Sequence, residues 1–121
     1  MQATLGTPLE VHCTVRGDLF ALPIDTATEL LRIAQEALSN TLKYADARHV
    51  TIELTFEPEQ SQLQVVDDGR GFDPTQVSGA GGFGLLSMRA RAAAIGAEFT
   101  ICSAPGQGTT LVVVLPRNTG A

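Results

Sequence analysis

The stretch LQVVDDGRGFDP, residues 63–74, joins an apolar run directly to two acids and two glycines. An apolar run bounded by turn-forming residues predicts a buried strand, and this one ends at Asp67 and Asp68. Gly69 and Gly71 follow at once, and glycine lets another group come close to the backbone. The stretch therefore predicts a strand whose end faces something that must approach its backbone.

Further strand patterns lie on both sides of this stretch. Residues 49–56, HVTIELTF, alternate apolar and polar side chains, and a turn at EPEQS leads from them into residues 62–68, which predicts an antiparallel hairpin. Residues 97–104 and 109–116 predict two more strands around the turn PGQG. Residues 9–16, LEVHCTVR, also alternate, so we expect a strand there that buries its apolar half.

Two helices are predicted between these strands. Residues 25–47 carry apolar residues at helical spacing without glycine or proline, and residues 85–96 end at a helix-stopping glycine. Residues 73–84, rich in glycine, are expected to form a loop. The order strand, helix, two strands, helix, two strands predicts an α+β fold, a two-layer α/β sandwich. Its mixed, mostly antiparallel sheet is expected to carry both helices on one face.

Length and charge restrict the class of protein. The chain has 121 residues, which suits one domain over residues 1–121, with a frayed tail at 117–121. Eight basic and thirteen acidic residues give a net charge of -5 without a basic stripe, which argues against nucleic acid as a partner. No apolar run spans a bilayer and no signal peptide begins the chain, so we expect a cytoplasmic domain without direct membrane contact.

The two cysteines, Cys13 and Cys102, have neither a CxxC spacing nor paired histidines beside them. The sequence therefore indicates no disulfide framework and no zinc site. We interpret both cysteines as small core residues.

Residues 79–84, GAGGFG, match the pattern G-x-G-x-x-G of dinucleotide-binding proteins. That fingerprint needs a strand directly before it and an acid about 20 residues later, whereas here a polar loop precedes it and Glu98 comes too early. The Gly-Lys pair of a phosphate loop is absent from the sequence. A nucleotide would therefore have to bind in another way.

Three polar residues of the first predicted helix, Glu36, Asn40 and Lys43, share one narrow face, because they lie at i, i+4 and i+7. They are able to act on one ligand. The alternative is that this face, together with Glu29 and Arg32, is the solvated side of an amphipathic helix. Its combination with DDGRG, the glycine-rich loop and GQGT, in that order, favours a ligand site.

A nucleotide suits the chemistry of these residues. A carboxylate such as that of Asp67 can accept a hydrogen bond from the exocyclic amino group of adenine, and adjacent glycines leave room for the flat base. The amide oxygen of Asn40 is a hard ligand for Mg²⁺, and Lys43 can neutralise phosphate charge. Glu36 can orient or deprotonate a nucleophile, and the backbone N–H groups of GGFG offer an anion site at the second helix.

Four segments, in order, resemble the motifs of the GHKL ATPases. RIAQEALSNTLKYADA resembles the asparagine box, VVDDGRGFD the first glycine box, GGFGLLSMRAR the second, and PGQGTTLVVVLP the last glycine-threonine motif. The resemblance runs from about Leu9 to Pro116. More narrowly, the chain resembles the ATP-binding catalytic (HATPase_c) domain of sensor histidine kinases of the nitrate-sensor-like subclass. Tyr44 and Ala90 depart from that subclass, which often has His and Glu there.

The resemblance implies ATP and Mg²⁺ as ligands and a role for each matching residue. Asn40 would bind Mg²⁺, Glu36 would be the polarising acid beside it, and Lys43 would lie near phosphate. Asp67 would bind adenine, and Thr109 would support Asp67 through hydrogen bonding. Glycines would shape the base pocket and the lid, namely Gly69 and Gly71 in the pocket and Gly82 and Gly84 in the lid.

The resemblance also implies transfer of the γ-phosphoryl group of ATP to a histidine on a separate dimerisation domain, with a response regulator as indirect partner. His12 and His49 lie on predicted strands, so neither is expected to be that phosphoacceptor. We therefore expect a fragment of a longer sensor kinase, membrane-anchored or not, that does not phosphorylate itself. Two alternatives stay open: a stand-alone GHKL protein serine kinase of the anti-sigma-factor type, and a non-enzymatic nucleotide-binding module.

Overall fold

The computed structural model describes residues 9–18, 22–73 and 84–116. Two of the sequence predictions concern residues outside these ranges. The lid glycine Gly82, with most of the glycine-rich loop, and the frayed tail at 117–121 lie outside the described residues.

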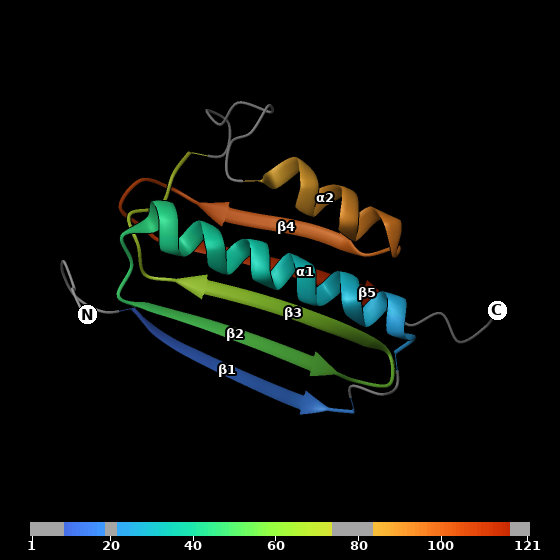
Figure 1. Ribbon diagram of the computed structural model, residues 1–121. Coiled ribbons are helices and arrows are strands. Elements are labelled where there is room, and N and C mark those ends of the chain that lie inside the picture. The colour runs from blue at the N-terminus through green and yellow to red at the C-terminus, as the bar shows by residue number, and fades with distance from the viewer. Residues whose placement is uncertain (1–8, 19–21, 74–83, 117–121) are drawn as a thin grey trace, which may run out of the picture.

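A five-stranded mixed sheet forms one layer of the fold (Figure 1). Its strands are β1 Glu10–Gly17, β2 His49–Phe56, β3 Gln60–Asp67, β4 Glu98–Ser103 and β5 Thr109–Pro116. They lie in the order β1-β2-β3-β5-β4. β1 is parallel to β2, and every other neighbouring pair is antiparallel, including the predicted hairpin of β2 and β3.

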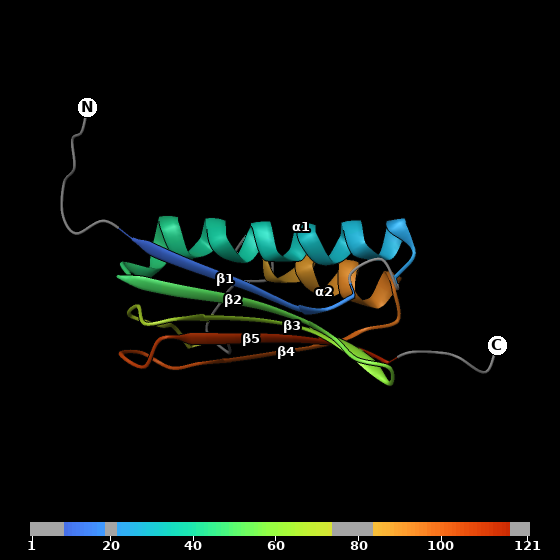
Figure 2. The same cartoon turned by 90° about the horizontal axis from the view of Figure 1, so that it is seen from below.

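Two helices form the second layer, on one face of the sheet (Figure 2). α1 spans Ile24–Asn40 and continues into one π-helical turn, η2, at Thr41–Ala45, while α2 spans Leu85–Ala94. The helical path ends at Asp46, whose φ of 52° is left-handed. The arrangement confirms the predicted two-layer α+β sandwich and the chain order of its elements. Within the described ranges, no helix combines the length and the apolar composition needed to cross a bilayer.

The core fills the space between the two layers. α1 turns an apolar stripe towards the sheet, including Leu30, Ile33 and Ala37. Met88 and Ala92 of α2 are buried beside it. Alternate strand residues complete the core, because successive side chains of a strand point to opposite faces. They are Val50, Ile52, Leu54, Phe56, Leu63, Val65, Leu111, Val113 and Leu115.

One strand differs from its sequence pattern. We expected residues 9–16 to bury their apolar half, but all eight residues of β1 are exposed, and Val11 and Val15 are 48% and 51% exposed. The physical reason is that β1 is an edge strand, whereas α1 lies over the middle of the sheet (Figure 1). The described helices therefore leave the helix-facing side of β1 uncovered.

The core positions predicted for the cysteines are also wrong, since Cys13 and Cys102 are both exposed. Cys13 shares the uncovered side of β1. On β4, alternation turns Phe99 and Ile101 towards the core and leaves Cys102 on the open face of the sheet.

Candidate functional site

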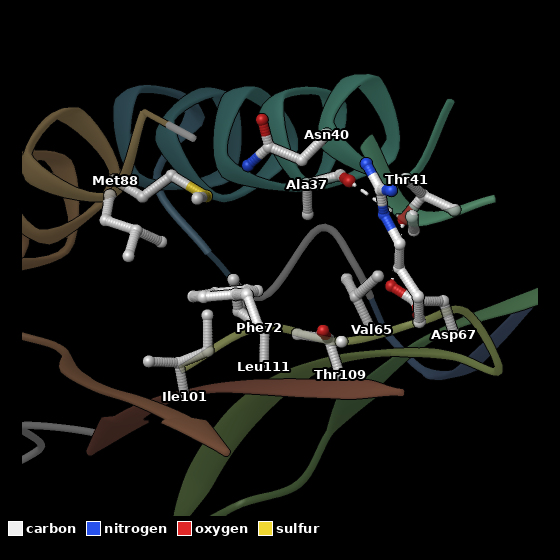
Figure 3. A pocket seen from close by; sticks show the side chains of 14 residues that line it. Ala37, Asn40, Thr41, Val65, Asp67, Phe72, Met88, Ile101, Thr109 and Leu111 are labelled. Atoms are coloured by element: carbon white, nitrogen blue, oxygen red, sulfur yellow. Dashed lines mark hydrogen bonds between the residues drawn. The ribbon is translucent and has the colours of Figure 1, made fainter. Parts of the chain in front are cut away.

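A pocket lies between the helix layer and the sheet, at the end of β3 (Figure 3). Figure 3 shows Asp67 and Thr41 together at one end of it and Met88 at the other. Residues of α1, η2, α2, β3, β4, β5 and the loop after β3 line the pocket. They are Ala37, Asn40, Thr41, Ala45, Val65, Asp67, Arg70, Gly71, Phe72, Leu85, Met88, Ile101, Thr109 and Leu111. A mostly apolar pocket with a few polar groups is the usual form of a small-molecule site.

Asp67 is the acid of this pocket, and it is only 9% exposed. Its Oδ1 accepts the backbone N–H of Gly69 at 2.9 Å. Its Oδ2 lies 3.2 Å from the hydroxyl of Thr41, whose single proton is shared with the carbonyl of Ala37, also at 3.2 Å. A carboxylate oxygen has two lone pairs, so Oδ2 keeps the capacity to accept another hydrogen bond. The pocket therefore ends in an acceptor whose orientation Gly69 fixes.

The loop after Asp67 runs too close to its neighbours for side chains at two positions. A Cβ on Gly69 would collide with the carbonyl of Ala45, and a Cβ on Gly71 would collide with that of Ala104. Gly71 also has a φ of 64°. The N–H of Arg70 donates to the carbonyl of Ala45 at 2.7 Å, which ties the loop to η2. Both predicted pocket glycines thus meet a steric requirement of the backbone.

Replacing Gly71 with Ala is expected to destabilise the fold more than the same change at Gly106 in the β4–β5 turn. Both glycines have positive φ, 64° and 80°, where alanine costs about 1 kcal/mol. A Cβ on Gly106 meets nothing within 4 Å, whereas one on Gly71 meets a carbonyl. We expect an additional loss of roughly 1–3 kcal/mol for Gly71→Ala in urea unfolding. Equal losses of unfolding free energy in the two variants would contradict the close approach of Gly71 to the carbonyl of Ala104.

Thr109 lies directly opposite Asp67 in the ladder between β3 and β5 and lines the pocket. Its hydroxyl is 2.8 Å from that of Ser103, while the hydroxyl that reaches Asp67 is that of Thr41. Thr41 occupies a position in the apolar stripe of the helix, so the sequence pattern does not point to its contact with Asp67. The available signal was a hydroxyl group at a position expected to be buried. Phe72, another lining residue, carried no such signal. Support of Asp67 by Thr109 stays a prediction.

The predicted polar face of the first helix divides between the pocket and the solvent. Asn40 ends α1 and lines the pocket. Glu36, one turn earlier, is half-buried and packs against Gly84 just before α2, where a Cβ would collide with its carboxylate. Lys43 is exposed in η2 and is not among the described lining residues. The structure thus places Asn40 in the pocket lining and Glu36 against the residue that precedes α2, and it leaves Lys43 at the surface.

Asp68 lies outside the pocket lining and ties the end of β3 to the start of β2. Its Oδ1 accepts the backbone N–H groups of Arg48 and His49, each at 2.9 Å, and its Oδ2 lies 2.7 Å from Nδ1 of His49. These hydrogen bonds, first that from the His49 backbone, lower the pKa of Asp68 to about 2. The second acid of the motif therefore has a structural role that the sequence did not indicate.

The free energy of unfolding is expected to decrease as the pH falls from 3.8 to about 2, and to decrease less in Asp68→Asn. The pKa of Asp68 is lower in the folded chain than in the unfolded one, so the ionised carboxylate stabilises the fold above the unfolded pKa. This stabilisation is lost as the pH falls through the folded pKa. Urea midpoints measured across this pH range would test it. Parallel curves for wild type and variant would rule out the contribution of Asp68.

The sequence pattern of one protein family matches most of this chain. The family is described as histidine kinase-, DNA gyrase B-, and HSP90-like ATPase, and the match covers residues 25–119. The chain therefore belongs to this family, the GHKL ATPases that its four motifs resemble.

Within the family, the chain is similar to bacterial sensor proteins. It is 42% identical over 102 residues to the sensor protein VraS of Staphylococcus saprophyticus, and 39% identical over 99 residues to VraS of Staphylococcus aureus. Each match covers 82% of this chain and 28% of the relative. The chain thus spans little more than a quarter of the length of these curated relatives.

Solved structures of histidine kinases share the fold. The histidine kinase domain of the blue-light activated histidine kinase EL346 from Erythrobacter litoralis superimposes with a TM-score of 0.67 at 26% identity, covering 88% of this chain and 54% of that one. The mycobacterial sensor histidine kinase MprB superimposes with a TM-score of 0.63 at 22% identity, covering 89% of this chain and 81% of that one. It therefore has a similar fold.

Proposed function

We propose that the pocket binds Mg-ATP and that the chain donates the γ-phosphoryl group to a histidine on a separate dimerisation domain of a sensor histidine kinase. The observation that carries the proposal is the buried carboxylate of Asp67 at the end of a mostly apolar pocket that Asn40 also lines. Membership of the family and the sensor proteins among its relatives support it. We place the kinase in the nitrate-sensor-like subclass on the motifs alone.

Adenine is the base that the end of β3 is suited to bind. The Oδ2 atom of Asp67 can accept a hydrogen bond from the exocyclic amino group, while the N–H of Gly69 donates to Oδ1. Ile101, Met88 and Leu111 offer apolar surface to the flat ring. Thr109, opposite Asp67, is proposed to support the acid once a nucleotide is present.

The phosphates are proposed to lie near the end of α1 and the start of α2, where Asn40 and Glu36 carry oxygen atoms of the kind that Mg²⁺ prefers. The amide oxygen of Asn40 would be a metal ligand, and Glu36, half-buried against Gly84, lies one turn earlier on the same helix. Bound Mg²⁺ would neutralise charge on the phosphate oxygens. Glu36 would orient the attacking imidazole and take up its proton, Lys43 would attract phosphate from the surface, and Gly84, with Gly82, would belong to the lid.

The experiment that tests this function supplies a phosphoacceptor as a separate domain. We expect no label on the chain alone after incubation with γ-labelled ATP, and label on an added dimerisation domain of the parent kinase. The label should be labile in acid, as phosphohistidine is, and absent when the acceptor histidine is replaced by Gln. Acid-stable label on serine would favour the serine kinase. Nucleotide binding without any transfer would favour a regulatory module, and label on the isolated chain would contradict the proposal.

A further inference from the structure

The helix-facing row of β1 is apolar and yet exposed. Val11, Cys13 and Val15 stand in register with three buried residues of β2, namely Val50, Ile52 and Leu54. Residues in register on neighbouring strands lie on the same face of a sheet. The row on β1 is thus a continuation of the core surface, but the described helices do not reach it.

The same residues present the open edge of the sheet. The N–H of Glu10 donates to the carbonyl of Arg48 at 2.8 Å, and backbone direction alternates along a strand. Even-numbered residues of β1 therefore bond to β2, while Val11, Cys13 and Val15 direct their N–H and C=O groups outwards. In the part of the chain that the structure describes, β1 pairs with β2 alone. A further strand is the element that satisfies such an edge.

We propose that a second copy of this chain pairs with this edge, antiparallel to it, about a twofold axis that passes between the Cys13 residues of the two copies. In that register, residues equally far from Cys13 face one another. Val11 of one copy then meets Val15 of the other, and Glu10 meets Arg16. All outward-directed backbone groups from Val11 to Val15 become hydrogen-bonded pairs, because the facing residues both point to the shared edge.

Charge and apolar surface both fit this register. Glu10 and Arg16 are exposed near opposite ends of β1, where Nε of Arg16 also lies 3.4 Å from Oε2 of Glu53 on β2, so two pairs of opposite charge flank the axis. On the helix-facing side, Val11 and Val15 of each copy pack around the two Cys13 side chains. This pairing buries the apolar row of β1 that the described helices leave exposed. The edge lies on the far side of the sheet from β4, which contributes to the pocket, so nucleotide binding and self-association can be tested separately.

The test is sedimentation equilibrium of the full 121-residue chain up to about 1 mM, the effective concentration typical of linked modules. We expect a reversible monomer–dimer equilibrium. Glu10→Arg and Arg16→Glu should each weaken dimerisation roughly tenfold, because each creates two like-charge pairs across the axis. The double variant Glu10→Arg/Arg16→Glu should restore it.

Glu98→Arg is the matched control, because it reverses an exposed charge on β4, the opposite edge strand, and should leave dimerisation unchanged. A chain that stays monomeric throughout would overturn the proposal. A dimer that both single variants leave intact would place association elsewhere on the molecule, and failure of the double variant to restore it would overturn the register.

Discussion

Replacing Asp67 with Asn is expected to abolish ATP binding while leaving the fold intact. The N–H of Gly69 donates to Oδ1 of Asp67, so an asparagine there must keep its oxygen on that side. Its amide nitrogen then takes the place of Oδ2 and presents hydrogens to the amino group of adenine, donor against donor. An unmatched polar group in a buried site weakens binding severely, and we expect a loss of roughly 100-fold or more.

Equilibrium dialysis with labelled ATP measures this loss, and thermal unfolding of the same sample checks the fold. The matched control is Asp68→Asn, the same substitution one residue along, at an acid that does not line the pocket. We expect Asp68→Asn to bind ATP as the wild type does. Equal affinity of Asp67→Asn and wild type would refute the assignment of Asp67 to adenine.

Replacing Asn40 with Ala is expected to remove the magnesium-dependent part of ATP affinity and to slow phosphoryl transfer roughly 100- to 1000-fold. On the proposed function, its amide oxygen is the metal ligand, and alanine has no donor to replace it. Adenosine lacks phosphates, so its affinity should not change. Transfer to a supplied dimerisation domain and adenosine binding by calorimetry measure the two effects.

Gln35→Ala is the control for Asn40→Ala, because it removes an amide from the exposed face of the same helix. We expect wild-type rates from it. Loss of adenosine binding in Asn40→Ala would mean that Asn40 shapes the base pocket, and unchanged transfer would mean that the metal ligand lies elsewhere.

Local periodicity predicted most of the fold. The alternation of HVTIELTF and the helical spacing of residues 25–47 record which side chains avoid water, and the structure buries those faces, including Ile52 and Ile33. The same pattern failed for β1. Alternation records a preference for burial and does not say which element provides the cover, and the place of β1 at an edge depends on long-range pairing.

The site was predicted only in part, for a related reason. The motifs supplied Asp67 and Asn40, and the structure brings both to one pocket. The contact of Thr41 with Asp67 joins residues far apart in the sequence, so no local pattern reveals it. The hydrogen bonds of Asp68 to the start of β2 were likewise invisible, because they depend on the register of two strands.

Calorimetric titration of the wild-type chain with ATP and with GTP, each with Mg²⁺, tests the central claim most directly. Adenine presents an amino donor at the position where guanine presents a carbonyl acceptor, and Asp67 is an acceptor. The account predicts that ATP binds and that GTP gives no measurable heat. Absence of ATP binding, or equal binding of the two nucleotides, would contradict recognition of adenine by Asp67.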